Sequence, residues 1–506
     1  MLATRPVAAQ APAAAEAWRG AVTPLAAGHW AYAALDRLVA AGWIEASRVD
    51  GARPLPIGAV AAALESAARA AGDGRGAGTV RRGSTARRAV APAVAGAADA
   101  AGDDATSRAL AEFARRAWAR FRREFPPTDA LASAFSLGYE ESVDADGRWR
   151  GVVFRPRLVW APGAPFALHY EPELRHGAAG AGRATTDAGH GRFGFAVRWK
   201  RLWLFAGRER LAFETGASGG VTLSDRAPLD GIGIGVVDPI VVPGIGRLHG
   251  LVYLSRIGGD GYGEVAGFGA ARVSLTPAPW LQLHLNRTTL VARRHGAAEL
   301  TPRDVLLILV GKHTEFEDQR ASVGLRLRTK LGGWALQPYL EWGFEDTAGL
   351  EEDPGIVTGI FAAAIPGWPG VSLRYEYTAF GEHALLFPGG EFLSRDWYRH
   401  LAGIRDRYVH EDGTPIGHPL GGYGYEHRVE AGMWSDDARL RVLLTAFRRR
   451  RSEGNILFDR QPGASIGGAL DVRYTAAGGL DLVAAFGAEL GLEGWATRRL
   501  HLGLRW

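Results

Sequence analysis

The sequence predicts an all-β transmembrane fold: a large antiparallel outer-membrane β-barrel of about 18 strands, with a small α-helical N-terminal region in the periplasm. Three observations predict it. Residues 500–506 alternate apolar and polar side chains and end on the aromatic Trp506. The same alternation recurs through roughly 375 residues, which is too long for one soluble sandwich. No apolar run reaches the length of about 18 residues that a helical span needs, so any membrane passage must use strands.

Composition supports this fold and excludes several chemistries. The chain of 506 residues contains 69 Gly and 16 Trp, as expected for many turns and an interfacial aromatic belt. It has no Cys, which excludes disulfides, zinc–cysteine sites and cysteine nucleophiles. The net charge of +5 arises from 59 basic and 54 acidic residues spread along the chain, so nucleic acid is not an expected partner. No cofactor or metal site is expected either.

Residues 1–17 are interpreted as the remnant of a signal segment. Ala9, Gln10 and Ala11 resemble a small-residue cleavage box, but the apolar stretch before them is short. We therefore expect the true start site to lie upstream of Met1.

Residues 18–72 form the predicted helical N-terminal unit. Trp30, Ala34 and Leu38 share one helical stripe that stops at Gly42, and residues 57–71 predict a second helix. Together they resemble one surface-layer-homology repeat. A small helical cap without a ligand is the alternative interpretation.

Two further segments precede the barrel. Residues 73–103 are rich in Ala, Gly and Arg without apolar periodicity, which predicts a flexible linker. Residues 104–127 predict an amphipathic helix with Phe113 and Phe121 on its apolar stripe, and this helix is a candidate plug for the barrel. Its arginines suit either phosphate head groups or solvent.

Residues 128–506 form the predicted outer-membrane barrel, because the hydrophobic period changes here from 3.6 to 2. Phe193, Phe195 and Val197, for example, alternate with small and charged residues. In a barrel the apolar face meets lipid and the charged face meets the lumen. The charges predicted to line the lumen, first of all as structural pairs, are Arg198, Arg326, Arg328, Glu341, Arg374 and Glu376.

Catalytic patterns are absent from the sequence, and we do not expect an enzyme. Ser218 lies among glycines in residues 216–220, but it lacks the strand, elbow and helix that expose a hydrolase nucleophile. A turn is the simpler interpretation.

The long loop of residues 381–426 contains the best binding candidates. Sugars stack on aromatic rings and bond to planar polar side chains, and this loop supplies both. The predicted polysaccharide-binding residues are Trp397, Tyr398, Asp406, Tyr408, Tyr423 and Tyr425. The alternative is that these rings form the interfacial belt or pack the loop into the barrel mouth.

Two sequence blocks resemble the capsule assembly Wzi family. The first runs from Gly207 through Leu211 to Pro228, and the second from Trp397 through Tyr408 to Glu426. The resemblance covers about residues 130–506. It implies a monomeric barrel in the outer membrane of a Gram-negative cell, plugged by helices at its periplasmic end. It also implies a lectin-like role in holding capsular polysaccharide at the cell surface.

The expected partners are therefore surface polysaccharide and outer-membrane lipid, with the polysaccharide export machinery as a further candidate. The alternative function is a porin that its N-terminal unit tethers to peptidoglycan, in which the lumen charges select small solutes. A soluble carbohydrate enzyme ranks third.

Overall fold

The computed structural model describes residues 23–26, 29–45, 52–72, 100–125, 131–144, 147–163, 165–179, 184–225, 228–257, 266–291, 317–345, 354–381, 397, 408, 415–435, 437–476 and 479–505. Its helices are α1 (Trp30–Ala40), α2 (Ile57–Gly72) and α3 (Ala100–Glu124). The strands of the first half of the chain are β1 (Ala52–Arg53), β2 (Leu131–Asp144), β3 (Gly147–Gly163), β4 (Phe166–Ala179), β5 (Thr185–Trp199), β6 (Leu202–Arg210), β7 (Ala212–Phe213), β8 (Pro228–Val236), β9 (Ile240–Val242) and β10 (Gly246–Ile257). They are followed by β11 (Ala266–Ala278), β12 (Leu281–Val291), β13 (Glu317–Leu327), β14 (Thr329–Leu331), β15 (Trp334–Glu345), β16 (Gly355–Ala364), β17 (Val371–Phe380), β18 (Gly424–Trp434), β19 (Leu440–Arg451), β20 (Gly463–Thr475), β21 (Asp481–Gly491) and β22 (Ala496–Arg505).

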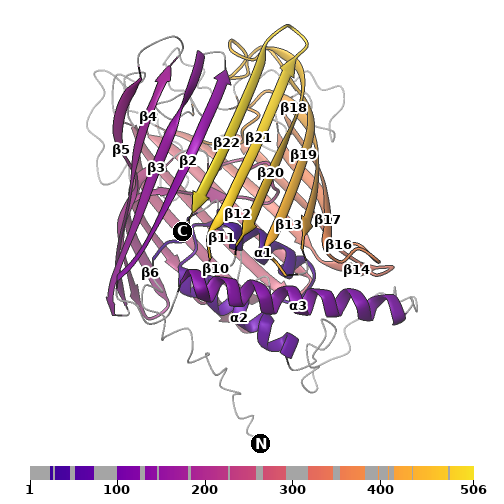
Figure 1. Ribbon diagram of the computed structural model, residues 1–506. Helices are drawn as coiled ribbons and strands as arrows, with labels where there is room; N and C mark the ends of the chain where they lie inside the picture. Colours follow the sequence, from indigo (N-terminus) through magenta and orange to yellow (C-terminus); the bar gives the residue numbers. More distant parts are fainter. Residues whose placement is uncertain are drawn as a thin grey trace, which may run out of the picture.

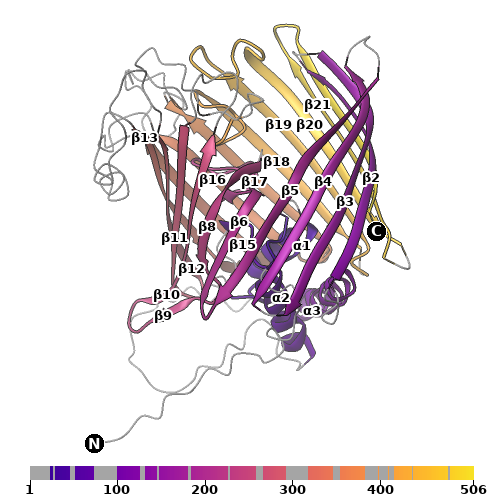
Figure 2. The same cartoon turned by 90° about the vertical axis from the view of Figure 1, so that its left-hand side faces the viewer.

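The strands close into one antiparallel barrel (Figures 1 and 2). Within the described chain it has 18 strands, because β9 and β14 pair with the same neighbours as β8 and β13 and extend them. Sequence neighbours pair around the wall, and β22 returns to β2 with Leu504 opposite Leu137. The closed sheet leaves no edge with unpaired backbone groups. The predicted barrel of about 18 strands is confirmed.

The outer wall is apolar, as a membrane-facing surface must be. Large apolar side chains on alternate positions are exposed, among them Leu137, Val152, Leu254, Leu444 and Leu502. Leaving so much apolar surface in water would be unfavourable, whereas lipid accepts it. The alternation found in the sequence therefore separates a lipid face from a lumen face.

The two ends of the barrel differ. All three helices lie at one end, which we call the helical end, with α1 inside the barrel and α3 across its opening (Figures 1 and 2). Arg37 of α1 donates to the carbonyl of Ala363 at 3.2 Å, and Arg120 of α3 bonds Asp481 at 3.0 and 3.2 Å. Strand connections at this end are short, and the long ones lie at the opposite end, which we call the loop end.

The N-terminal unit shares one hydrophobic core with the barrel. Trp30 and Leu35 of α1, Leu64 of α2 and Phe113 and Phe121 of α3 are buried together. His29 caps α1 by accepting the backbone N–H of Ala31 at 3.2 Å. None of the described helices is long and apolar enough to span a bilayer.

The predicted helices are present with small shifts in their bounds. α3 begins at Ala100, so residues 100–103 of the expected linker are helical, and it ends at Glu124, within the segment 104–127 assigned to it. Residues 1–22 and 73–99, where the signal remnant and the remaining linker were expected, lie outside the described residues, as does Trp506.

A segment between β6 and β8 does not continue the wall. Residues 211–225, which we call the in-folded loop, contain β7, and β7 pairs with β1 of the N-terminal unit. Its apolar side chains Leu211, Phe213, Val221 and Leu223 are fully buried. The barrel lumen is therefore bridged by a two-stranded sheet that joins wall and helical unit.

Candidate functional site

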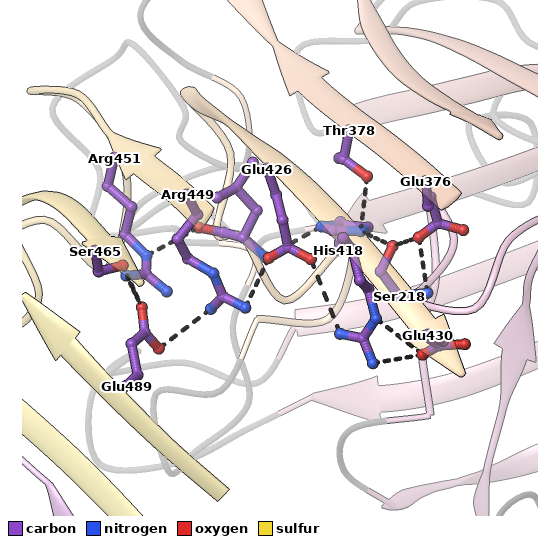
Figure 3. Close-up of polar contacts among 12 residues, drawn as sticks. Ser218, Glu376, Thr378, His418, Glu426, Glu430, Arg449, Arg451, Ser465 and Glu489 are labelled. Carbon is purple, nitrogen blue, oxygen red and sulfur yellow. Dashed lines mark hydrogen bonds and ion pairs between the residues drawn. The ribbon is translucent and has the colours of Figure 1, made fainter. Parts of the chain in front are cut away.

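Glu376 on β17 holds the in-folded loop against the wall (Figure 3). Its carboxylate accepts the backbone N–H groups of Ala217 and Ser218 at 2.8 and 2.9 Å and the hydroxyl of Tyr339 at 2.6 Å. A Cβ on Gly216 would collide with this carboxylate, so the close approach requires glycine there. A buried carboxylate with several donors is well satisfied and fixes the position of the loop.

Ser218 also contacts His418, but their geometry is not that of a nucleophile and its base. Nδ1 of His418 accepts the N–H of Leu420 at 3.1 Å, so the ring proton is on Nε2. This Nε2 faces Oγ of Ser218 at 2.7 Å, while the Ser218 hydroxyl donates to Glu376. The imidazole therefore donates to the serine instead of taking its proton. The chain of bonds ties the two loops and β17 together (Figure 3).

Trp397 and Tyr408 are buried by the packing of the long loop. Both side chains are 0% exposed. The ring of Trp397 meets Phe380 edge-on at 4.9 Å, and the guanidinium of Arg320 lies 3.9 Å from the ring centre of Tyr408. Both rings are fully buried, so neither can stack on a sugar in this arrangement.

The long loop is also joined to the in-folded loop through its backbone. Ile416 donates its N–H to the carbonyl of Tyr408 at 3.0 Å, and Ser224 donates to the carbonyl of Ile416 at 2.9 Å. Since β17 begins beside the helical end, the loop that follows it starts from the loop end. The in-folded loop follows β6 and also leaves the wall at the loop end, so two loops from the same end meet inside the lumen.

The remaining candidate sugar-binding residues are dispersed. Tyr423 is buried where the long loop returns to β18, and its carbonyl accepts from Asn455 at 3.1 Å. Alternate residues of a strand face the same side of the sheet. Tyr425 therefore faces the outer wall, as the exposed Val429 and Met433 of the same strand do. Tyr398 and Asp406 lie outside the described residues.

Four of the predicted lumen charges lie inside the barrel; one of them, Glu376, is described above. Arg326 donates to the carbonyl of Thr215 in the in-folded loop at 2.9 and 3.1 Å. Arg374 lies 3.6 Å from Glu430. Glu341 is buried and accepts from Ser322 at 2.6 Å.

The other two predicted lumen charges lie at turns of the helical end. Arg198 pairs with Asp238 at 3.0 Å, and Arg328 donates to the carbonyl of Pro279 at 2.6 Å. Both arginines therefore lie at the rim of the barrel and not in its lumen. There they supply a hydrogen bond to a turn carbonyl and an ion pair to a turn carboxylate.

An inner-wall ladder of charges on β18, β19 and β21 was not singled out by the sequence reasoning. Arg449 bridges Glu426 at 2.6 Å and Glu489 at 3.4 Å, and Arg451 bonds Glu489 at 3.1 Å (Figure 3). Its sequence signal is the run of arginines at residues 448–451, of which alternate members point inward. The ladder consists of matched pairs and stiffens the wall.

A second missed residue is Glu209, which lies in the first block that carries the family resemblance. It is buried, bonds Arg192 at 2.7 and 2.9 Å and lies 2.6 Å from His169. Arg192 also donates to the carbonyl of Pro24 at 3.2 Å. This block therefore joins the barrel wall to the N-terminal unit.

Glu124 at the end of α3 closes the helical end. It accepts from Nε2 of His29 at 2.7 Å, from the indole of Trp30 at 2.8 Å and from Arg505 at 2.9 Å. Burial, opposed by Glu124, lowers the pKa of His29 to about 4. Burial alone would raise the pKa of Glu124, but His29, Arg505 and the donated hydrogen bonds outweigh it and hold that pKa well below 4.5.

A polar cavity of about 330 Å³ remains between α1 and the barrel wall. Its lining includes Tyr32, Arg53, Glu214, Arg374 and Glu430. Arg53 pairs with Glu214 at 3.1 Å, as Arg374 does with Glu430. The lining charges are largely neutralised by one another.

Comparisons with known proteins identify the architecture. A family model, described as capsule assembly protein Wzi, matches residues 153–493. None of the curated protein sequences compared with the chain matches it. A solved structure from Escherichia coli, described as Wzi, an outer membrane protein involved in group 1 capsule assembly and a carbohydrate binding β-barrel, is similar at 15% identity and a TM-score of 0.63. The similarity covers 94% of this chain and 96% of that one, and it shows the shared fold.

Pseudomonas aeruginosa barrels are less similar. OccK11 (OpdR) has 12% identity and a TM-score of 0.44 over 74% of this chain and 94% of its own. OccK5 (OpdH) has 9% identity and a TM-score of 0.47 over 74% of this chain and 96% of its own. The family match, in contrast, covers more than half of the sequence and agrees with the resemblance found there. The chain belongs to the capsule assembly protein Wzi family.

Proposed function

We propose that this outer-membrane barrel retains capsular polysaccharide at the cell surface without conducting solutes and without catalysis. The observation that carries the proposal is the occupied lumen: the in-folded loop, the long loop and the N-terminal unit meet inside the barrel and are bonded to its wall. A polymer would then be held at the loop end, outside the lumen. The family membership and the carbohydrate binding named for the E. coli structure support this function.

The proposed polymer contacts lie on the long loop, while its buried rings hold that loop in shape. Trp397 and Tyr408 are fully packed, so we assign them to the shape of the surface. Tyr398 and Asp406 remain the candidates for direct sugar contact. Each contact can be weak, because a long polymer bound to many copies of the barrel dissociates slowly.

The orientation and partners belong to the same proposal. Short connections at the helical end and long ones at the loop end are typical of periplasmic and extracellular sides, respectively, which supports a periplasmic helical unit. We propose that the barrel acts as a monomer. We also propose that it receives polymer from the export machinery on the extracellular side.

The porin alternative requires the lumen segments to move aside. Glu376 on β17 and Arg326 on β13 both bond the in-folded loop to the wall, which opposes such a movement. A soluble carbohydrate enzyme has less support still, because the exposed outer wall is apolar.

Direct binding tests the proposal. Purified barrel in detergent is immobilised, and capsular polysaccharide from the same cells is passed over it. We expect slow dissociation that becomes faster when the barrel density is lowered, and weaker binding in Tyr398→Ala with Asp406→Ala. Arg201→Gln at the helical end serves as the control. Absence of polymer binding by the folded wild-type chain would overturn the proposal.

A further inference from the structure

Two arginines stand on the outer wall near the loop end of β19. Arg448 and Arg450 are exposed, whereas Arg449 and Arg451 point inward to the carboxylates of the inner-wall ladder. Side chains alternate along a strand, so the outward members share the face of the exposed Leu444. The arginine run therefore has one inner pair bound to protein and one outer pair.

The height of the outer pair is marked by aromatic side chains on the neighbouring strands. In the β18–β19 register His427 is opposite Arg448 and Tyr425 is opposite Arg450. Tyr377 lies 4.9 Å from His427 between ring centres, and Tyr425 lies 5.8 Å from it. Such belts lie at the level of lipid head groups.

The membrane core begins below this belt. Toward the helical end the same outer faces carry Val429, which is 49% exposed, and Leu444, which is 55% exposed. Arg448 and Arg450 therefore stand where acyl chains meet head groups. That is the level of the phosphates of an outer-leaflet lipid, and long arginine side chains can reach upward from it.

Among the residues that the structure describes, no carboxylate pairs with the outer arginines. Neither Arg448 nor Arg450 forms an ion pair with a carboxylate of the described chain, and their outward neighbours on β20 are Ile466 and Ala464. Other outward arginines near the loop end do form one: Arg148 pairs with Glu141 at 2.8 Å. Two adjacent cations at a membrane surface need an external anion to offset their repulsion.

We propose that Arg448 and Arg450 form a binding site for the phosphates of an outer-leaflet glycolipid. A guanidinium bonds a phosphate with two parallel N–H donors, which suits a phosphorylated sugar head group at this level. Tyr425 provides a ring beside the head group, and the apolar faces of β18 and β19 below receive its acyl chains. The site lies on the outer wall, and it includes neither Tyr398 nor Asp406, the residues proposed to contact the polymer.

The test uses the full chain folded in detergent and two probes, bisphosphorylated lipid A and its dephosphorylated form, with bound lipid counted by native mass spectrometry. We expect the wild-type barrel to prefer the phosphorylated form. Arg448→Gln with Arg450→Gln should weaken that binding about thirtyfold, the effect expected of two cations near anionic head groups. Arg201→Gln with Lys330→Gln removes the same charge from exposed positions at the helical end and should change binding less than threefold.

Equal binding of the two lipids by the wild-type chain would overturn the proposal, and this comparison needs no variant. Equal losses of lipid binding in the two double variants would overturn it as well, because any surface cation would then contribute equally to binding. Inorganic phosphate alone should show no measurable binding; binding as tight as that of the lipid would refute a lipid site. Heat-modifiable migration on gels verifies that each variant is a folded barrel.

Discussion

At the scale of single residues, Glu376 shows how the lumen is closed. Its carboxylate is almost fully buried and satisfies two backbone donors of a loop that is distant in sequence. The sequence identified Glu376 as a lumen charge, because its strand alternates. It did not identify Ala217 and Ser218 as its partners, since nothing in the local pattern reports which loop folds inward.

Replacing Glu376 is expected to loosen the in-folded loop. Glu376→Ala leaves the N–H groups of Ala217 and Ser218 without their acceptor, at a local cost of about 3 kcal/mol. Glu376→Gln keeps one carbonyl acceptor and should cost less. Hydrogen exchange of residues 214–222 measures the effect by mass spectrometry. Unchanged protection in Glu376→Ala would show that the carboxylate does not hold the loop.

The pH dependence of helical-end docking follows from His29 and Glu124. Undocked His29 takes up a proton below pH 6.5, whereas the docked side chain remains neutral down to about pH 4. The free energy that favours docking of the helical unit on the barrel should therefore decrease by about 3 kcal/mol as the pH falls from 6.5 to 4. Glu124, with its lowered pKa, adds a loss in the same direction below pH 4.5. Protease sensitivity of residues 52–72 as a function of pH measures this loss.

His29→Asn supplies the control for that titration. Asparagine keeps a cap for α1 but does not titrate. The variant should lose most of the change between pH 6.5 and 4. A wild-type pH profile that matches that of His29→Asn would assign the transition to other groups.

At the scale of elements, the wall and the helix across its opening were predictable, and the in-folded loop was not. The strands follow from period 2, because lipid and lumen impose opposite polarities on alternate residues. Gly233 of β8 illustrates the alternation: it faces inward, and the ring of Phe205 occupies the space that a Cβ atom on residue 233 would need. The pairing of β1 with β7 joins segments about 160 residues apart and leaves no periodic signal. Aromatic composition likewise did not distinguish rings that bind from rings that pack.

The packing role of the loop rings makes a specific prediction. Trp397→Ala with Tyr408→Ala should destabilise the long loop by more than about 3 kcal/mol, because each removes a fully buried ring. Polysaccharide retention should then fall together with protection of residues 415–423 from hydrogen exchange. Tyr408→Phe keeps the ring beneath Arg320 and should preserve both. Lost retention with unchanged protection would instead indicate direct sugar contact.

At the scale of the whole molecule, the lumen of the barrel is filled by protein segments, so we do not expect it to act as an open pore. In planar bilayers the wild-type protein is expected to give no steady conductance steps. Removal of residues 214–222 should produce them, because those residues bridge the lumen beside the cavity of about 330 Å³. Large steady steps from the wild-type chain would favour the porin alternative.

The central claim, retention of polysaccharide, is tested most directly in cells. Polysaccharide is quantified in the cell-bound and medium fractions of a strain that lacks this protein, with the wild-type chain restored as the control. The account predicts unchanged total polymer, a shift of polymer from cells to medium, and recovery on restoration. Unchanged cell-bound polymer in the strain that lacks the protein would contradict it.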